Sequence, residues 1–562
     1  MNKEKLTFNR GQSLVELLVA MSFFVLAVAT IGFLILDADV SSRQGIERMQ
    51  AILLVKEGLE AARSIRDYQF NDLTAGNHGI LLSGNRWIFS GTSDIQDQFT
   101  RVVTVEDIDV KRKKITSQVI WQFSPQRSDS VSLVTYLTNL KPPGGGMLAY
   151  ADISGADDVI RYKILDENGN WSSEQTVPDF GVPLDRPTRV LELYSSPTRN
   201  EKILVTKHFI NSTDPDQYIF AQVWNGSSWG NVIQLAAWAG TVRPQVRDFD
   251  GDYLDNGDFL LIYEDNTNIP KYRIWNGTNW SSQASCPNVG GNPEWIIVRN
   301  RPGTNQAMLA VLDAGLDTNT SLWNGSSWSA VTEHASASVA LGYETLSFAW
   351  SPNDTSIGAL TFNEASDNFP NIRIWNSTSW SSSMENINIG GAARNMQIIG
   401  RPTANEFLAC FKGSASDINC MESDFSPLWY DLTELETTSD TGSQMSFDLG
   451  YEKQSGALAI SVYSDRTAYP KYNIYDPATN AWSSQFSLSS ISAALETARI
   501  IPDPNSDDMM VLMGVTDQDV HSVVWDGTNN TFYTSGGRAQ MEHGISGSND
   551  LDFWFDFAWN RI

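Results

Sequence analysis

One acidic segment carries the residue types that metal binding requires. Asp248, Asp250 and Asp252 occupy alternate positions, and carboxylates so placed supply the oxygen ligands that Ca²⁺ prefers. Tyr253 stands where a calcium loop has glycine, and the equivalent repeats along the chain lack such a run of three alternating acids. Two interpretations stay open: a calcium loop, with calcium as the only cofactor the sequence suggests, or a solvated turn between two strands.

Two arginines form a second set of candidates. Arg189 and Arg394 stand at equivalent places in the repeats described below, each at the start of an expected innermost strand. If those strands surround a central channel, both guanidinium groups could bind an acidic ligand in it. The alternative is that they are solvated loop residues, where most arginines lie.

Catalytic motifs are missing from the sequence. The five histidines are scattered without zinc-ligand spacing, and no nucleophile elbow, phosphate loop or HExxH motif occurs. A glycosidase would need two carboxylates on either side of the scissile bond, and no single repeat carries an extra acidic pair. We therefore expect no enzymatic activity, with a surface-displayed glycoside hydrolase-like propeller as the alternative.

Cysteines and tryptophans each allow two interpretations. Cys410 and Cys420 flank a short polar segment, so they either form a disulfide across a hairpin, which would indicate an oxidising compartment, or remain free thiols. Four tryptophans recur at one position of a repeated turn and either stack on sugars or close hairpins, and we favour hairpin closure. These residues are Trp229, Trp280, Trp328 and Trp380.

The N-terminus combines a basic segment with an apolar run. Residues 1–11 are polar with three basic side chains, and residues 17–36 are apolar and uncharged. A helix of about 20 residues just spans the hydrocarbon layer, and the basic flank predicts a cytoplasmic N-terminus. No small-residue cleavage site follows the run, as a secretory signal would require. Gly11 instead precedes the run, and Glu16 stands at its edge.

These residues resemble the type IV prepilin family, whose leader is cut after a glycine and whose fifth mature residue is glutamate. The resemblance implies that a prepilin peptidase removes residues 1–11, cutting between Gly11 and Gln12. It also implies that residues 12–36 form a transmembrane and assembly helix, in which Glu16 pairs with the N-terminal amine of a neighbouring subunit. The family prefers phenylalanine where this chain has Gln12, so methylation of the new N-terminus stays open.

The following region continues the same plan. Ile46, Met49 and Val55 recur at helical spacing, and strands with alternating patterns follow from about residue 79. The resemblance implies a pilin-like α+β head over residues 37–140. Residues 141–146 contain two prolines and three glycines, which predicts a linker between domains.

Residues 147–562 are repetitive. A hairpin motif of the type WNGSSW recurs about every 50 residues, a period typical of four-stranded propeller blades. Its Asn-Gly pairs predict tight turns with positive φ at both central positions. The C-terminal segment 551–560 matches the first strand of a blade but has no blade after it. We therefore predict an all-β propeller of eight blades whose last strand completes the first blade, with seven blades as the alternative.

Charge and domain order together predict a surface protein. The net charge of −27 repels phosphate backbones, so we expect no nucleic-acid partner. The chain is expected to be multi-domain and single-pass in the cytoplasmic membrane before assembly, with its C-terminal domains extracytoplasmic, and on a pilus or the cell surface afterwards. Its predicted partners are other pilin or pseudopilin subunits, the prepilin peptidase, the membrane and an unknown surface ligand.

Two functions follow from this organisation. The first is a minor pilin-like or pseudopilin-like subunit that presents a propeller for adhesion or for protein or glycan binding. The second is a structural pseudopilin of a type II-like secretion or DNA-uptake system. The fold alone does not separate them.

Overall fold

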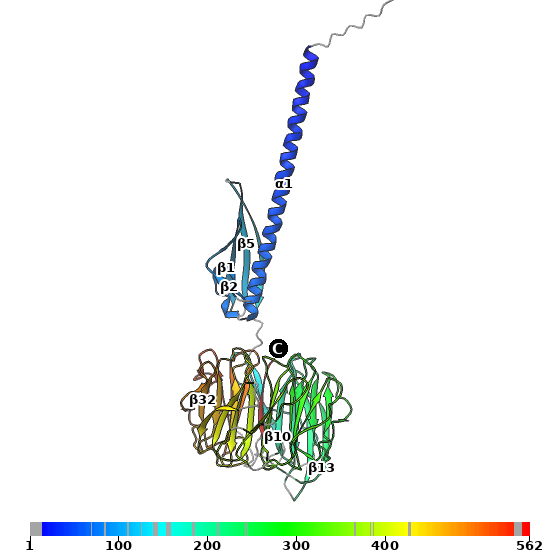
Figure 1. The fold of residues 1–562 in the computed structure, drawn as a ribbon, viewed down its shortest axis with the longest axis vertical. Helices are drawn as coiled ribbons and strands as arrows, with labels where there is room; N and C mark the ends of the chain where they lie inside the picture. Colours follow the sequence, from blue (N-terminus) through cyan, green and yellow to red (C-terminus); the bar gives the residue numbers. More distant parts are fainter. Residues whose placement is uncertain are drawn as a thin grey trace, which may run out of the picture. The chain divides into compact units, whose positions relative to one another are not determined.

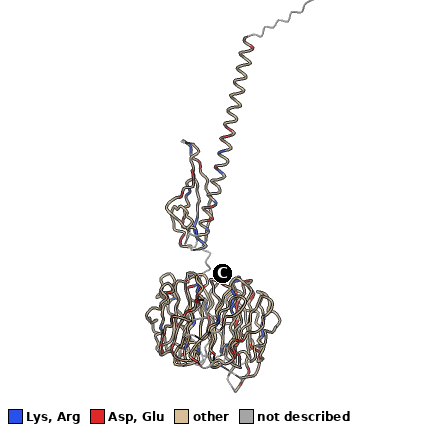
Figure 2. Tube along the Cα trace, viewed as in Figure 1, with Lys and Arg blue, Asp and Glu red and all other residues tan. Residues whose placement is uncertain are grey.

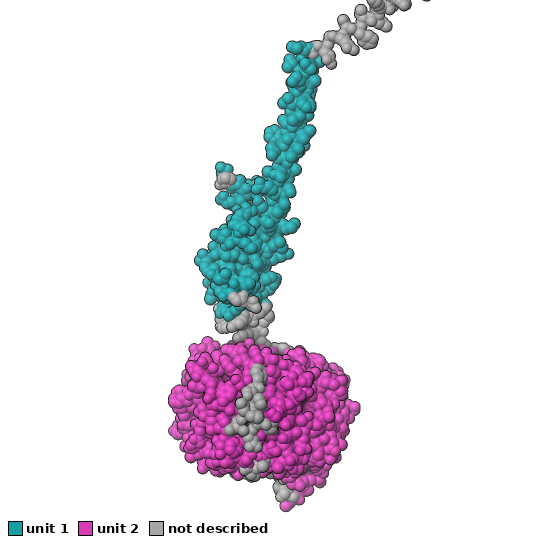
Figure 3. All heavy atoms as spheres, in the orientation of Figure 1, with its two compact units in different colours: residues 1–140 teal, residues 141–562 magenta. Residues whose placement is uncertain are grey.

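The computed structural model describes residues 14–561 with short gaps, in two compact units, residues 1–140 and 141–562 (Figure 3). Each unit is described by itself. The predicted cleavage site, Gly11 and Gln12, lies outside the described residues. The complete set outside the description is residues 1–13, 69, 84–85, 110–111, 125, 139–143, 153–158, 183–185, 211–212, 242, 244–245, 365–366, 383, 386, 425–428, 544–552 and 562.

The first unit begins with one long helix, α1 (Leu14–Tyr68) (Figure 1). Its large apolar side chains between Leu17 and Leu36 are exposed within the unit. By length and composition this part of the helix is able to cross a membrane. It fits a membrane anchor or a signal sequence.

A short 3₁₀ helix, η1 (Phe70–Asp72), leads from α1 into an antiparallel sheet. The sheet has the order β2-β1-β4-β5-β6, with β3 beside β4. The α+β arrangement predicted for this region, a long helix followed by a small antiparallel sheet, is therefore present. The strands are β1 (Gly76–Ser83), β2 (Arg86–Ser90), β3 (Asp94–Gln96), β4 (Phe99–Asp109), β5 (Arg112–Ser124) and β6 (Arg127–Thr138).

The second half of α1 packs on this sheet. Val55 joins an apolar cluster with residues of β4 and β5, and Gly58 marks a close approach, because a Cβ there would clash with the Ser117 side chain. Ile46 and Met49, which the helical spacing assigned to the buried face, are instead 58% and 67% exposed. The buried stripe begins at Ala51, and the turn before it meets the sheet through a hydrogen bond from Trp121 Nε1 to Glu47 Oε2 at 3.2 Å.

The second unit is a β-propeller of eight sheets in the described part of the chain, each with four or five strands. The first blade consists of β40 (Phe555–Trp559), β7 (Gly146–Asp152), β8 (Val159–Leu165) and β9 (Gln175–Thr176), and the second of β10 (Thr188–Ser195), β11 (Lys202–His208), β12 (Asp216–Trp224) and β13 (Trp229–Ala239). The third blade consists of β14 (Phe249–Tyr253), β15 (Phe259–Tyr263), β16 (Lys271–Trp275) and β17 (Ala284–Ser285), and the fourth of β18 (Pro293–Asn300), β19 (Ala307–Asp313), β20 (Thr318–Trp323) and β21 (Thr332–Ala335).

The remaining four blades repeat the same order. The fifth blade consists of β22 (Leu346–Trp350), β23 (Gly358–Phe362), β24 (Asn371–Trp375) and β25 (Met384–Glu385), and the sixth of β26 (Ala393–Gly400), β27 (Phe407–Gly413), β28 (Ile418–Ser423) and β29 (Tyr430–Glu436). The seventh blade consists of β30 (Phe447–Tyr451), β31 (Ala459–Tyr463), β32 (Lys471–Asp476), β33 (Ala481–Trp482) and β34 (Phe486–Ser487). The eighth consists of β35 (Leu495–Pro502), β36 (Met509–Val515), β37 (Val520–Asp526), β38 (Thr531–Phe532) and β39 (Met541–Glu542).

The C-terminal strand closes the ring. β40 pairs antiparallel with β7, with Trp559 opposite Gly146 and Phe555 opposite Tyr150. The predictions of eight blades and of a composite first blade are confirmed. Closure leaves no unpaired inner strand at the join.

Hairpins at the outer strands use the repeated turn. Trp275 and Trp280 form a cross-strand bridge, and their rings are tilted at 49° with centres 5.5 Å apart, as expected for tryptophans that close hairpins. The turn differs from the predicted one. Asn276 does not have positive φ, whereas Gly277 does, at 87°. Asn276 Oδ1 instead accepts the N–H groups of the two residues after Gly277, so the loop is four residues long.

A disulfide joins Cys410 and Cys420, which face each other across β27 and β28 with a Cα–Cα distance of 4.1 Å. This settles the alternative left open by the sequence. Cys286 is a buried free thiol.

Candidate functional site

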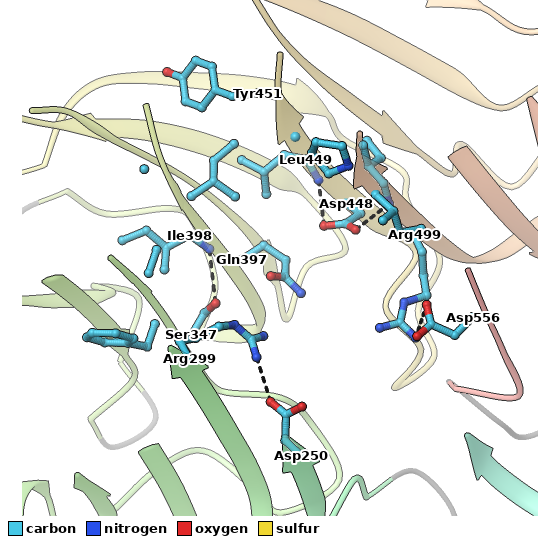
Figure 4. A pocket seen from close by; sticks show the side chains of 18 of the residues that line it. Asp250, Arg299, Ser347, Gln397, Ile398, Asp448, Leu449, Tyr451, Arg499 and Asp556 are labelled. Carbon is cyan, nitrogen blue, oxygen red and sulfur yellow. Dashed lines mark hydrogen bonds and ion pairs between the residues drawn. The ribbon is translucent and has the colours of Figure 1, made fainter. Parts of the chain in front are cut away.

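The centre of the propeller holds a cavity of about 500 Å³, lined by the innermost strand of every blade (Figure 4). We call it the central cavity. Acidic and basic residues are interspersed over the propeller strands (Figure 2), and both kinds reach this cavity. Its charged lining includes three arginines and five carboxylates. They are Arg247, Arg299 and Arg499, and Glu192, Asp250, Glu344, Asp448 and Asp556.

Arg247 is the centre of a buried ion-pair network. Its guanidinium lies 2.9 Å from Glu344, 3.3 Å from Asp250 and 3.6 Å from Glu192, and all four side chains are at most 6% exposed. Burial alone would lower the pKa of Arg247, but the three surrounding carboxylates raise it above its ordinary value. Arg299 adds a second cation 2.7 Å from Asp250. The network therefore joins blades that are far apart in sequence.

Phe553 lies between two of these cations. The guanidinium groups of Arg247 and Arg499 each lie 5.5 Å from the centre of its ring, a cation–π distance. Arg499 also contacts Glu192 at 3.0 Å and Asp556 at 3.4 Å. Phe553, two residues before the closing strand, thereby contacts arginines on two other blades.

A repeated polar residue ties neighbouring inner strands together. Asp250, Asp448 and Asp556 each accept a hydrogen bond from a main-chain N–H of the next blade, at 2.9, 2.7 and 2.8 Å. Ser347 does the same to Ile398 N at 3.3 Å. These residues hold the second position of matching pentapeptides, FDGDY, FDLGY, FDFAW and LSFAW. This hydrogen bond to the next blade recurs in every second blade.

Two of these carboxyls titrate near neutral pH. Burial raises the pKa of Asp448 to about 7, although the N–H groups of Ile500 and Leu449 oppose the shift. Burial also raises the pKa of Asp556 to about 7, against the charge of Arg499. Asp250 behaves differently, because Arg247 and Arg299 outweigh burial and lower its pKa. The cavity thus offers fixed guanidinium donors together with carboxyls that can both donate and accept hydrogen bonds.

Aromatic and apolar groups complete the lining. Tyr194, Trp350 and Tyr451 border the cavity, as do Pro302 and Pro402. A concave site with apolar walls and a few convergent polar groups is typical of a small-molecule or side-chain binding pocket. The arrangement suits a polar ligand that is neutral or carries both charges, since the fixed cations are already matched by carboxylates.

The two arginines selected from the sequence do not line this cavity. Arg189 and Arg394 do begin matching strands, β10 and β26. The guanidinium of Arg189 donates to Phe209 O and Ile210 O, and that of Arg394 lies 4.9 Å from the ring centre of Tyr343. The arginines that line the cavity are Arg247, Arg299 and Arg499 instead.

The three aspartates of the proposed calcium loop are not in a loop. Residues 249–253 form β14, and Asp248 and Asp250 are buried. Asp248 pairs with Lys207, Asp250 pairs with Arg247 and Arg299, and Asp252 accepts from Asn300 N at 2.8 Å. Both the calcium loop and the solvated turn are therefore wrong for this segment. Within the described residues, no group of three or more His, Cys, Asp or Glu side chains is placed to hold a metal ion.

Glu16, the predicted assembly residue, lies in the first turn of α1. No sequence pattern indicates Arg247 or Arg499, because ion pairing across the ring leaves no local signal. The aspartates were detectable in principle. Asp448 and Asp556 share the pentapeptide position described above, and an acid repeated inside an apolar strand indicates a buried partner.

Comparisons with known proteins add a fold likeness only. No protein-family model matches the sequence, and no curated protein matches it. The BP39L lectin from Burkholderia pseudomallei is 9% identical, with 63% of this chain and 99% of that chain covered and a TM-score of 0.43. The β-propeller domain of the trilobed protease from Pyrococcus furiosus is 8% identical, with 64% and 99% covered and a TM-score of 0.36. Likenesses this distant carry no argument about function.

Proposed function

We propose that this chain is a pilin-like or pseudopilin-like subunit, anchored and assembled through α1, that presents its propeller as an extracytoplasmic binding module. The observation that carries the proposal is the division of α1 into two parts. The apolar part from Leu17 to Leu36 is exposed, while the part from Ala51 onward is packed on the sheet. An exposed apolar helix of this length requires a membrane or a bundle of similar helices around it.

Two further observations support the proposal. Glu16 stands in the first turn of the apolar part, where a carboxylate is costly unless a partner neutralises it. The disulfide between Cys410 and Cys420 is typical of proteins in an oxidising compartment. For the propeller, the central cavity with its mixed lining favours ligand binding over a purely structural role.

Replacement of Glu16 tests the assembly role. Glu16→Leu keeps the helix apolar but removes the charge that we expect to pair with a neighbouring subunit. The amount of protein in sheared surface fibres, relative to the amount in the membrane, is expected to fall by about tenfold or more. Loss of a buried charge pair costs more than about 1.4 kcal/mol, and that energy alone is a factor of about ten in an equilibrium.

Asp39→Leu is the matched control, because it removes an exposed carboxylate from the same helix beyond the apolar run. It is expected to leave the fibre fraction unchanged. Equal fibre fractions for Glu16→Leu and the unaltered chain would contradict the assembly role.

A further inference from the structure

A second polar cluster lies away from the central cavity, at the boundary of blades two, three and four. Lys207 is on β11, Asp248 immediately precedes β14, and Glu264 immediately follows β15. They border a small cavity of about 140 Å³ together with Trp238 and Glu294. Neither the central cavity nor the proposed assembly role uses these residues.

The geometry brings an amine and a carboxyl carbon together without solvent. Lys207 Nζ contacts Asp248 Oδ2 directly, and the two side chains are 2% and 1% exposed. The amine also lies 5.6 Å from the ring centre of Phe209 and 5.7 Å from that of Trp238. Burial takes both charges out of water, and this desolvation is costly unless the two groups stay in contact.

Glu264 is positioned to take part in proton transfer. Its main-chain N donates to Asp248 O at 3.0 Å, and its side chain is hydrogen-bonded to the Asp248 carboxyl. Burial, followed by the charge of Asp248, raises the pKa of Glu264 well above its ordinary value. A raised pKa favours the protonated carboxyl of Glu264, which can donate a hydrogen bond to Asp248.

We propose that Lys207 and Asp248 condense spontaneously into an intramolecular amide bond that covalently joins blade two to blade three, with Glu264 as the general acid. The ammonium of Lys207 first passes a proton to the Asp248 carboxylate within their contact, giving a neutral amine and a carboxylic acid. Nζ then attacks Cγ of Asp248, while the Glu264 carboxyl donates to the oxygen that becomes negative.

The collapse of the tetrahedral intermediate completes the bond. The Glu264 carboxylate takes the proton that nitrogen releases and passes it to the departing hydroxyl, so the Cγ–O bond breaks and one water molecule leaves. The remaining hydroxyl becomes the amide C=O and returns its proton to Glu264. The Nζ–Cγ amide forms, and Glu264 ends in its original protonation state. Ammonium and carboxylate become amide and water, so atoms and charge balance without an oxidant or co-reactant. The product replaces two buried charges by one neutral amide.

Peptide mass spectrometry of the full-length protein, purified in detergent and digested with trypsin under denaturing conditions, tests the bond. An amide on Lys207 prevents cleavage after that residue. We expect residues 203–247 and 248–271 in one cross-linked ion whose mass is lower than their sum by one water. Separate peptides that end at Lys207 and begin at Asp248, with no cross-linked ion, would overturn the proposal and leave the pair as a buried ion pair.

Variants separate the roles of the three residues. Lys207→Arg keeps the positive charge but cannot form the bond, so the cross-linked ion is expected to disappear. Glu264→Gln is expected to slow bond formation by about a hundredfold or more. Glu294→Gln changes a second carboxyl of the same cavity that is paired with Arg243 at 2.9 Å, and it is expected to leave the bond intact. A full yield of cross-linked ion with Glu264→Gln would overturn the role of Glu264.

Discussion

Removal of residues 553–562 is expected to prevent the propeller from folding. The deletion takes away β40, the innermost strand of the first blade, and leaves the whole edge of β7 unpaired. It also removes five aromatic side chains, each at most 6% exposed, and burial of one such side chain contributes about 3–5 kcal/mol. These residues are Phe553, Trp554, Phe555, Phe557 and Trp559. A loss of this size exceeds the usual net stability of a domain, about 5–15 kcal/mol.

The deletion also breaks contacts with the second and eighth blades. Asp556 no longer accepts from Leu193 N or pairs with Arg499, and Phe553 no longer separates Arg247 from Arg499. Soluble yield of the full-length variant in detergent and its cooperative unfolding, followed by tryptophan fluorescence, measure the effect. Removal of residues 561–562 alone is the control and is expected to change neither. A cooperative transition at the same denaturant concentration for the longer deletion would show that the ring does not depend on its C-terminal strand.

Arg247→Met is expected to destabilise the propeller by about 3–5 kcal/mol, because it leaves buried carboxylates without their cation. Glu192, Asp250 and Glu344 would then face one another across the cavity, with Arg299 and Arg499 as the remaining arginines of its lining. Methionine is close in length to arginine and keeps most of the packing. The expected loss of stability therefore comes mainly from removal of the positive charge, not from lost packing.

Urea unfolding of the full-length protein measures this change in the free energy of unfolding. Tryptophan fluorescence reports mainly on the propeller, because only Trp87 and Trp121 of the 19 tryptophans lie in the first unit. Arg299→Met is the matched comparison. Arg299 is 41% exposed, and Asp250 keeps its second partner, Arg247, when Arg299 is replaced. The free energy of unfolding is therefore expected to fall by about 1 kcal/mol or less. Equal losses for both variants would contradict the central position of Arg247.

The architecture was largely predictable because its signals are local. The blade period, the WNGSSW turns and the unmatched C-terminal strand lie in short stretches of sequence, and together they predicted eight blades and their closure. The turn geometry itself was not predicted. Asn276 Oδ1 accepts main-chain N–H groups and lengthens the loop to four residues, an effect of side-chain bonding that the Asn-Gly pair alone does not reveal.

The charged interior was not predictable in the same way. FDGDY has low strand propensity by composition, yet residues 249–253 form β14. Asp250 is stabilised there by Arg299 and by Val298 N, both about 50 positions later in the sequence. Tertiary pairing of this kind overrides local preference, which is why these acids were interpreted as a loop. The same long-range pairing placed Arg247 in the cavity instead of Arg189.

The mature N-terminus tests the central claim, that this propeller is carried by a processed fibre subunit. Mass spectrometry of the protein from cells with an active prepilin peptidase is expected to find a chain that begins at Gln12 and retains Glu16 and the apolar run to Leu36. Gly11→Ala, which alters the residue before the cut, is expected to leave the leader in place. A mature chain that begins beyond residue 36, or one that keeps residues 1–11 despite the peptidase, would contradict the account.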